Sequence, residues 1–330
     1  MMKGSRLSRY VSLDLGSSSI SWCDLSTEEV VSEPNLIVVD QKRWKVMDVG
    51  LSAASMEGRA EGNLIVLRPI RGGRLDDVRL AERYFRAVIK RISSSRRGKP
   101  HIALATPSFL TTAEKRVMAS ALSKAGAASV IFVDSTVAAA VGAGADIQGP
   151  DGVMVASIGA QTTFAGILAL GDSIETQNGF VGGESLNEAI SRYLRDVYQL
   201  IMFDSDIEEL KVALVDLTDG ATSVVATLKG RHVDTGADHT VEVESSELTS
   251  AVRSAVGSIC DVVLNTLKQA PAEISNDLSK QGIHLVGRAS LLRGFDELIE
   301  SLVRIPAHHP PVVERAVVLG AAKILGQVRN

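Results

Sequence analysis

Two segments of this sequence place glycine and hydroxyl side chains where a β-hairpin would turn. They are Asp14-Leu15-Gly16-Ser17-Ser18-Ser19 and Ser157-Ile158-Gly159-Ala160-Gln161-Thr162-Thr163. In each, one apolar run leads into the turn and a second leaves it, which predicts a hairpin. Glycine lets backbone amides approach a ligand closely, so such a turn can donate hydrogen bonds to phosphate oxygens. One turn of this kind is weak evidence, but its recurrence favours a polyphosphate contacted by both hairpins.

The residue before each turn differs between the two segments. Asp14 precedes the first turn, where a carboxylate can hold Mg²⁺ directly or through water. Ser157 has the corresponding place before the second turn. Because the two hairpins recur in register on the scale of a domain, the sequence predicts duplicated α/β domains rather than a short solenoid repeat.

Alternating β-rich runs and amphipathic stretches predict the elements that position these turns. In the first half we expect strands at residues 9–15, 20–25, 101–106 and 129–133, and helices at 75–92, 111–125 and 135–144. In the second half we expect strands at 152–159, 164–170 and 283–286, a small sheet within 222–243, and helices at 185–198, 246–267, 291–303 and 314–325. Thr111 and Glu114 have the spacing of a capping box at a helix start. The last helix is rich in alanine and glycine, which predicts close packing against another backbone.

Bulk composition narrows the class of protein. The chain has 330 residues, 45% of them hydrophobic and 22% charged, which is typical of a globular protein of two domains. Its net charge of −4 argues against nucleic-acid binding, and no stretch approaches the ~20 apolar residues of a transmembrane helix. Cys23 and Cys260 are expected to be reduced core thiols, and His308 and His309 to lie in a loop with no metal-site spacing. We therefore expect a cytoplasmic protein without a secretory signal.

Several motifs in one colinear order resemble the MreB family of bacterial actins, within the actin-like ATPases. Besides the first turn, they include Glu33-Pro34-Asn35, Arg68-Pro69-Ile70-Arg71-Gly72-Gly73, Gly182-Gly183-Glu184 and Ser290-Leu291-Leu292-Arg293-Gly294. The resemblance implies an α/β fold, the actin-like ATPase fold of two ribonuclease-H-like domains, each with a smaller inserted subdomain. Domain I would comprise residues 1–145 with a subdomain at about 30–75, and domain II residues 146–310 with one at about 185–245. Residues 311–330 would form a C-terminal helix that returns to domain I.

The same resemblance implies that ATP, or GTP, binds with Mg²⁺ in the cleft between the domains. Asp134 has the place of a hydrolytic carboxylate and, with Thr162, is a catalytic candidate; Asp14 is the candidate metal ligand. The implied nucleotide contacts are Asp14, Gly16, Ser17, Ser18, Ser19, Gly159, Ala160, Gln161, Thr162, Thr163, Gly182, Gly183, Glu208, Lys211, Gly287, Arg288, Ala289 and Ser290.

The chain departs from the family pattern at three motifs. Ser157 replaces an aspartate that faces the metal, and Ala160-Gln161 replaces two glycines of the second phosphate turn. Gly287-Arg288-Ala289 replaces three glycines at the adenosine loop, where Arg288 either crowds the base, stacks on it or pairs with a phosphate. Asp134-Ser135-Thr136 replaces Glu-Glu-Pro. These differences predict that nucleotide hydrolysis is slow or absent.

Ordinary structural roles remain open for the same residues. Asp134 suits a helix N-cap as well as a catalytic group. Thr162-Thr163 and Gly182-Gly183 suit plain turns, and Glu208 and Lys211, one helical turn apart, suit a solvated pair.

Two functions follow from these features. The favoured one is a bacterial actin homologue that binds ATP and polymerises into cytoskeletal filaments, acting in cell shape or cell-wall morphogenesis with itself and morphogenesis proteins as partners. The alternative is a hydrolysis-deficient scaffold or regulatory protein that acts by partner binding. A metabolite kinase is disfavoured because the subdomain segments match filament proteins.

A basic loop predicts peripheral contact with an anionic membrane surface. The residues concerned are Arg91, Arg96, Arg97 and Lys99, together with Lys3, Arg6 and Arg9 near the N-terminus. A run of basic residues is more commonly a solvated surface, and that alternative remains open here.

Overall fold

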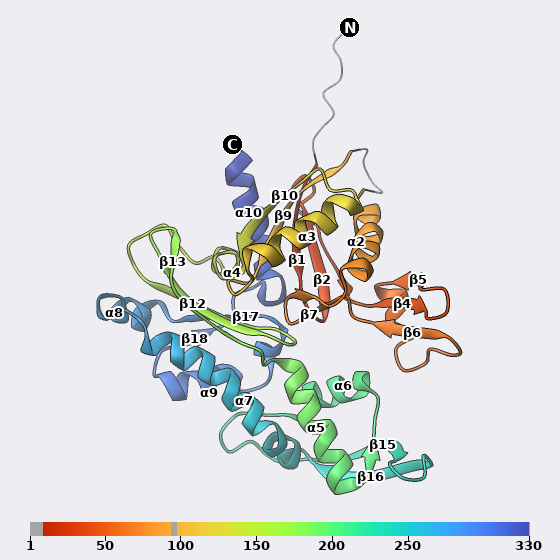
Figure 1. The fold of residues 1–330 in the computed structure, drawn as a ribbon. Coiled ribbons are helices and arrows are strands. Elements are labelled where there is room, and N and C mark those ends of the chain that lie inside the picture. The colour runs from red at the N-terminus through yellow and green to blue at the C-terminus, as the bar shows by residue number, and fades with distance from the viewer. Residues whose placement is uncertain (1–8, 94–97, 330) are drawn as a thin grey trace. The chain divides into compact units, whose positions relative to one another are not determined.

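A computed structural model describes residues 9–93 and 98–329 of the chain (Figure 1). The chain divides into two compact units, one of residues 1–147 and 314–330 and the other of residues 148–313. Lys3, Arg6, Arg96 and Arg97, which belong to the membrane prediction, lie outside the described residues.

The first unit is built on a five-stranded sheet with the order β10-β9-β1-β2-β3. Its strands are β1 (Arg9–Leu15), β2 (Ser19–Asp24), β3 (Val30–Pro34), β9 (Pro100–Thr106) and β10 (Ser129–Asp134). β1, β2 and β3 form an antiparallel meander, while β9 and β10 run parallel to β1. The carboxyl ends of β1 and β10 therefore lie on either side of β9, at the same edge of the sheet.

Helices cover both faces of this sheet, because neighbouring residues of a strand point to opposite sides. On one face, Ile102 and Leu104 of β9 belong to a core with α2 (Val78–Ser93) and α3 (Thr112–Ala125). On the other, Ala103 and Ala105 pack with α4 (Ser135–Ala143) and α10 (Ala316–Arg329). A separate small sheet has the order β5-β4-β6. The remaining elements of this unit are β4 (Ile37–Asp40), β5 (Lys45–Val49), α1 (Leu51–Ala54), β6 (Leu64–Leu67), β7 (Ile70–Arg71) and β8 (Arg74–Leu75).

The second unit repeats the first sheet's topology. The strand order of its sheet is β13-β12-β11-β17-β18. An antiparallel meander is formed by β11 (Val153–Ile158), β12 (Thr163–Ala169) and β13 (Asp172–Gly179). The strand β17 (Ile283–Val286) pairs in parallel with β11, and β18 (Ala307–His308) pairs in parallel with β17. Because meander and parallel strands recur in the same spatial order, the predicted duplication of an α/β domain is confirmed.

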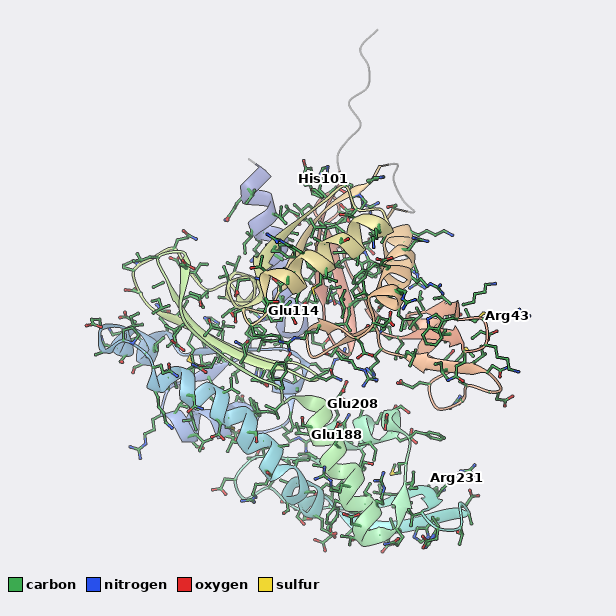
Figure 2. All side chains as sticks on the ribbon, in the orientation of Figure 1. Arg43, His101, Glu114, Glu188, Glu208 and Arg231 are labelled. Carbon is green, nitrogen blue, oxygen red and sulfur yellow. The ribbon has the colours of Figure 1, made fainter. Side chains whose placement is uncertain are left out.

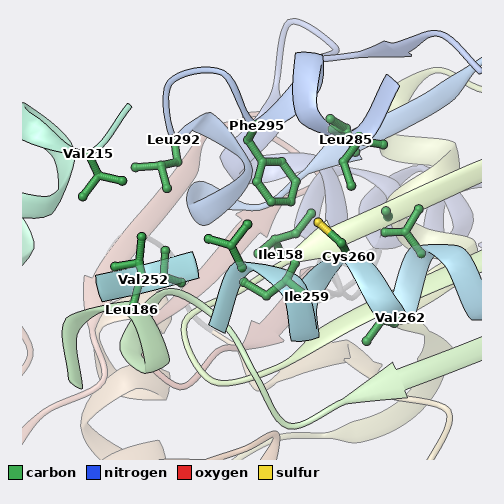
Figure 3. Close-up of a cluster of buried hydrophobic side chains, with 14 of the residues drawn as sticks. Ile158, Leu186, Val215, Val252, Ile259, Cys260, Val262, Leu285, Leu292 and Phe295 are labelled. Carbon is green, nitrogen blue, oxygen red and sulfur yellow. The ribbon is translucent and has the colours of Figure 1, made fainter. Parts of the chain in front are cut away.

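One face of this sheet packs on helices in a large apolar core, part of which is drawn in Figure 3. Ile158 and Leu285 come from the sheet, Ile259 from α7 and Phe295 from α9, and each is at most 1% exposed. The helices are α5 (Gly183–Tyr198), α6 (Asp204–Leu214), α7 (Ser245–Lys268), α8 (Ala272–Gln281) and α9 (Phe295–Val303), and β14 (Leu200–Ile201), β15 (Val225–His232) and β16 (Asp238–Glu244) form a small sheet.

Most predicted elements are present with small shifts, and three details were wrong. The helix expected from residue 75 begins at Val78, because Leu75 pairs with Ile70 in a two-stranded ribbon. The helix expected from residue 291 begins at Phe295, after a 3₁₀ turn over Arg288–Leu291. His308 lies in β18 rather than in a loop, and its Nε2 is 3.0 Å from Nδ1 of His284. Cys23 and Cys260 are free and buried, as expected.

Two cations that were expected to face a membrane form ion pairs within the first unit. Arg9 is 9% exposed and forms an ion pair with Asp24 at 2.6 Å. Arg91 forms an ion pair with Glu33 and donates a hydrogen bond to the carbonyl of Val49. The Arg9 guanidinium is therefore enclosed, whereas the Arg91 side chain is 37% exposed, and contact with a membrane stays a prediction. Within the described residues, no helix is long and apolar enough to cross a bilayer.

Candidate functional site

The first group of candidate residues lies where β1 turns into β2. Asp14 is half-buried, and no described residue donates a hydrogen bond to it or forms an ion pair with it. Loss of water around this carboxyl raises its pKa to about 6. A carboxyl that the fold leaves unpartnered and partly dehydrated fits a bound cation, which would favour its ionised form.

The backbone of the first turn is held by Asn35. The side-chain amide of Asn35 donates to the carbonyl of Ser17 at 2.8 Å, and its backbone N–H donates to the carbonyl of Ser18 at 2.9 Å. Asn35 is 0% exposed and also donates to the carbonyl of Ile70. Because these bonds use carbonyls, they leave the amides of the turn to other acceptors. Gly16, Ser17, Ser18 and Ser19 all lie in this turn or at the start of β2.

Asp134 ends β10 and starts α4. Its Oδ1 accepts hydrogen bonds from the backbone N–H groups of Thr136 at 2.7 Å and Val137 at 3.3 Å. The N-cap role left open by the sequence is therefore confirmed. A catalytic role for Asp134 stays a prediction, and the cap orients its carboxylate at the same sheet edge as Asp14.

The roles of Asp134 can be separated by replacing it with asparagine. Asparagine caps helices about as well as aspartate, so we expect Asp134→Asn to change the free energy of unfolding by less than about 0.5 kcal/mol. If the carboxylate assists hydrolysis, the same variant should lower the ATP turnover rate by at least tenfold. Asp134→Ala, which also removes the cap, should cost about 1 kcal/mol of stability. A phosphate-release assay beside urea denaturation checks both effects; equal turnover in wild type and Asp134→Asn would rule out the catalytic role.

The second turn is joined to the N-terminus of α5. The backbone N–H groups of Gly183 and Glu184 donate to the carbonyls of Gly159 at 2.9 Å and Ala160 at 2.8 Å. Gln161 donates from its side chain to Glu184 at 2.6 Å. A Cβ on Gly182 would lie 2.5 Å from the carbonyl oxygen of Gly159, so only glycine allows this contact.

The two threonines of the second turn have local structural contacts. The carbonyl of Thr162 accepts a hydrogen bond from the backbone N–H of Gly159, which closes the turn. Thr163 begins β12 and donates its hydroxyl to the carbonyl of Val181 at 2.8 Å. The catalytic assignment of Thr162 is not tested by these contacts and stays a prediction.

Lys211 is buried, so the Glu208–Lys211 pair is not merely solvated. The Lys211 side chain is 6% exposed, and its Nζ contacts Glu208 at 2.6 Å and the carbonyl of Gly183 at 3.2 Å. Glu208 lies on α6 (Figure 2) and also accepts a hydrogen bond from Asn187 of α5. Burial opposes its ionisation, but these bonds and the nearby charges of Lys211 and Arg288 hold the pKa of Glu208 below its usual range. Asn187 Oδ1 is buried without a partner, as expected where a ligand would donate a hydrogen bond.

The loop after β17 closes the group in the second unit. Gly287 has φ of 85°, and a Cβ there would lie 2.4 Å from the carbonyl oxygen of Ile158. Ala289 packs beside Gly183, where an added Cβ would lie 3.3 Å from the Ala289 Cβ. Ser290 is buried and donates its hydroxyl to the carbonyl of Gly287. Arg288 is exposed and lies close enough to Glu208 to influence its ionisation.

The predicted residues thus form one group in each unit. The second unit brings together the 159–163 turn, the start of α5, Glu208 with Lys211, and the 287–290 loop. Asp14, the 16–19 turn and Asp134 share an edge of the first unit's sheet. The cleft between the domains stays a prediction.

The sequence predicted no individual role for Asn35, Glu184 or Asn187. Asn35 and Glu184 lie within family motifs, and Asn187 follows Glu184 by three residues. Their importance comes from burial and from partners far along the chain, as in the 35-residue separation between Asn35 and Ile70. The available signal for Asn35 was an asparagine placed directly before the apolar run of residues 36–39.

Comparison with known proteins identifies the family. The profile of the MreB/Mbl protein family matches residues 8–330. The chain belongs to this family. It is 29% identical over 299 residues to the cell shape-determining protein Mbl of Bacillus cereus, covering 90% of each chain. It is 28% identical over 305 residues to the cell shape-determining protein MreB of Escherichia coli K12, covering 91% of this chain and 88% of that one.

Solved structures agree with this MreB/Mbl assignment. MreB5 of Spiroplasma citri bound to AMPPNP has a TM-score of 0.89 and 25% identity, covering 98% of this chain and 97% of that one. A MamK double helical filament has a TM-score of 0.80 at 16% identity, covering 96% and 98%, which shows the fold alone. The actin-like ATPase fold is therefore established, and the chain is a homologue of cell shape-determining proteins.

Proposed function

We propose that this MreB/Mbl-family protein binds ATP with Mg²⁺ and polymerises into filaments that act in cell shape. The observation that carries the proposal is the convergence in the second unit of the 159–163 turn, the N-terminus of α5, Lys211 and the 287–290 loop. MreB5 of Spiroplasma citri, similar over 98% of this chain, has been solved with AMPPNP and with ADP.

The residues present fit such a ligand. Asp14 would hold Mg²⁺, and the amides of both turns would contact phosphate oxygens. Glu208 and Asn187 would face the nucleoside with an acceptor each, while Lys211 keeps Glu208 ionised. Bound Mg²⁺ would supply neutralisation of phosphate charge. Ser157 offers only a neutral hydroxyl where the family pattern has a carboxylate, so magnesium would contribute less than in a protein with both acids.

The test combines calorimetry with polymer assays. We expect ATP to bind in the presence of Mg²⁺, and filaments to appear by sedimentation and negative-stain microscopy with ATP. Ser157→Asp should increase the Mg²⁺ dependence of ATP affinity by about tenfold, because a carboxylate complements the cation better than a hydroxyl. Ser258→Asp, at an exposed position on α7, is the charge-matched control.

The scaffold alternative makes the opposite prediction. It is favoured by the lost carboxylate at Ser157 and by Arg288 in the adenosine loop. No binding of ATP or GTP to the wild type, together with no rescue by Ser157→Asp, would replace the proposal with the scaffold. Strictly monomeric behaviour at high concentration with every nucleotide would contradict polymerisation.

A further inference from the structure

A shallow surface cavity, open to solvent, lies in the second unit, away from the residues assigned to the nucleotide. It has a volume of about 450 Å³ and is lined by Tyr193, Ser246, Glu247, Ser250 and Ala251. Tyr193 comes from α5 and the other four from the first two turns of α7. The cavity therefore combines an aromatic ring, a carboxylate and two hydroxyls from two helices that pack together.

Glu247 is the centre of a hydrogen-bonded cluster at this cavity. Its Oε2 accepts the phenolic O–H groups of both Tyr193 and Tyr198, the latter at 2.7 Å. Its Oε1 accepts the backbone N–H of Glu244 at 3.2 Å, as part of the capping box of α7. The rings of Tyr193 and Tyr198 meet edge to face with centroids 6.1 Å apart. These contacts hold the carboxylate and both rings in fixed orientations.

The donors to Glu247 within the described residues are two phenolic hydroxyls and a backbone N–H, all of them neutral. Among residues 9–93 and 98–329, no lysine, arginine or histidine forms an ion pair with Glu247 or with the neighbouring Glu244. Glu244 accepts hydrogen bonds from the hydroxyls of Ser223 and Ser246, which are also neutral. The phenolic hydrogen bonds hold the pKa of Glu247 below its usual range, so it is ionised at neutral pH. The N-terminus of α7 offsets part of this charge, but two carboxylates remain at one helix end.

An ionised carboxylate beside an aromatic ring is the arrangement that binds organic cations. A primary ammonium donates to the carboxylate and is attracted to the face of the ring, and at a solvent-open site such as this one the ring contributes about 0.5–1 kcal/mol. Within the described part of the chain, Glu244 and Glu247 do not belong to any group of three His, Cys, Asp or Glu side chains that could hold a metal ion. The hydroxyls of Ser246 and Ser250 suit the remaining N–H donors of an ammonium.

We propose that the cavity between α5 and the start of α7 binds an alkylammonium group, with Glu247 as its counter-ion and Tyr193 as its aromatic wall. The group is either that of a free polyamine or that of a lysine side chain on another protein. None of the lining residues belongs to the nucleotide candidates, so binding here does not require a bound nucleotide.

The test is calorimetric titration of the full chain without nucleotide, using spermidine and a tetralysine peptide with blocked termini as probes. Glu247→Gln removes the charge and keeps one carbonyl oxygen, which can accept from the backbone N–H of Glu244 while the amide NH₂ donates to the tyrosine hydroxyls. We expect it to weaken binding of the preferred probe at least tenfold. Glu297→Gln is the matched control, because Glu297 also lies in the first turn of a helix, α9, and is exposed. It should change affinity by less than twofold.

The outcomes distinguish a polyamine from a protein lysine as the ligand, and they show when the proposal fails. Tighter binding of tetralysine than of spermidine assigns the cavity to a protein partner, and the reverse assigns it to a polyamine. Tyr193→Leu should weaken either probe, whereas Tyr193→Phe should retain most of the affinity because the ring remains. The proposal is overturned if wild type and Glu247→Gln bind the probes with equal affinity. It is also overturned if neither probe binds at concentrations up to about 10 mM, which is on the order of the weakest useful affinity. A thermal melt of each variant confirms that it is folded.

Discussion

Asp14→Asn should lower the affinity for ATP in the presence of Mg²⁺ by at least 100-fold and, at the same time, raise the stability of the protein without ligand. The loss follows because Asp14 is the only carboxylate assigned to the metal. The gain follows because the folded protein disfavours the ionised carboxyl, whose pKa is raised to about 6. An amide of the same shape removes that cost, which is on the order of 1–3 kcal/mol.

The pH dependence of this gain has a defined sign. Between pH 3.8, the ordinary value, and about 6, the folded protein binds the proton of Asp14 more tightly than the unfolded chain does. Wild-type stability from this group therefore falls as the pH rises through that window and is constant above it. The stability difference between Asp14→Asn and wild type should be near zero below pH 3.8 and fully developed above pH 6.

Urea denaturation at several pH values, without nucleotide or magnesium, measures the stability, and calorimetry measures ATP affinity. Asp24→Asn is a contrasting control, because Arg9 and Ser26 hold the pKa of Asp24 below its usual range, so that change should destabilise. Unchanged ATP affinity in Asp14→Asn would remove Asp14 from the site. A loss of stability at pH 8 would show that its carboxylate is favoured by the fold.

Gly320→Ala should destabilise the first unit by about 3 kcal/mol or more. The helices α4 and α10 approach so closely that a Cβ on Gly320 would lie 1.8 Å from the carbonyl oxygen of Ala138. Gly142 has the reciprocal contact, with its Cβ position 1.8 Å from the carbonyl oxygen of Ala316. The added methyl would meet backbone, which cannot rotate away, so the helices would have to separate and lose packing.

The same helix contains its own control. Gly326 of α10 has no atom within 4 Å of its Cβ position. Gly326→Ala should therefore follow helix propensity alone and stabilise by about 0.5–1 kcal/mol. Thermal and urea unfolding of both variants measure the difference; similar effects of the two substitutions would mean that α4 and α10 are not in backbone contact in solution.

Local features of the sequence were sufficient for most elements. The capping box of Thr111 and Glu114 forms as predicted, because its partners are three residues apart and no distant contact competes. The two hairpins could be predicted because a glycine-containing turn between two apolar runs is a local signal that depends on no distant residue. The strands near residues 37–67 and 172–179 and the helix Ala272–Gln281 were missed. The buried strand Ile37–Asp40 is a short apolar run without alternation, the other strands are half-exposed, and the helix has one buried side chain, so each carries weak periodicity.

The family and fold followed from motifs in colinear order, and the profile match and the structural similarity confirm them. The roles of site residues depended on distances that no local pattern contains. Lys211 could not be told from a solvated lysine until its burial against Gly183 was known. The sequence predicted that Arg9 and Arg91 would be surface charges, yet Arg9 forms an ion pair with Asp24 and Arg91 forms one with Glu33.

By itself, the sequence determined the duplicated α/β architecture, the family and the identity of the turns that suit phosphate, because these depend on neighbours along the chain. Only the tertiary structure decided that Asp14 has no hydrogen-bond or ion-pair partner among residues 9–93 and 98–329, that Asp134 caps a helix, and that Glu247 accepts hydrogen bonds from two tyrosines. Burial and charge balance depend on groups that the chain brings together from distant positions. Tyr193 and Glu247, 54 residues apart, meet only because α5 and α7 pack on one core.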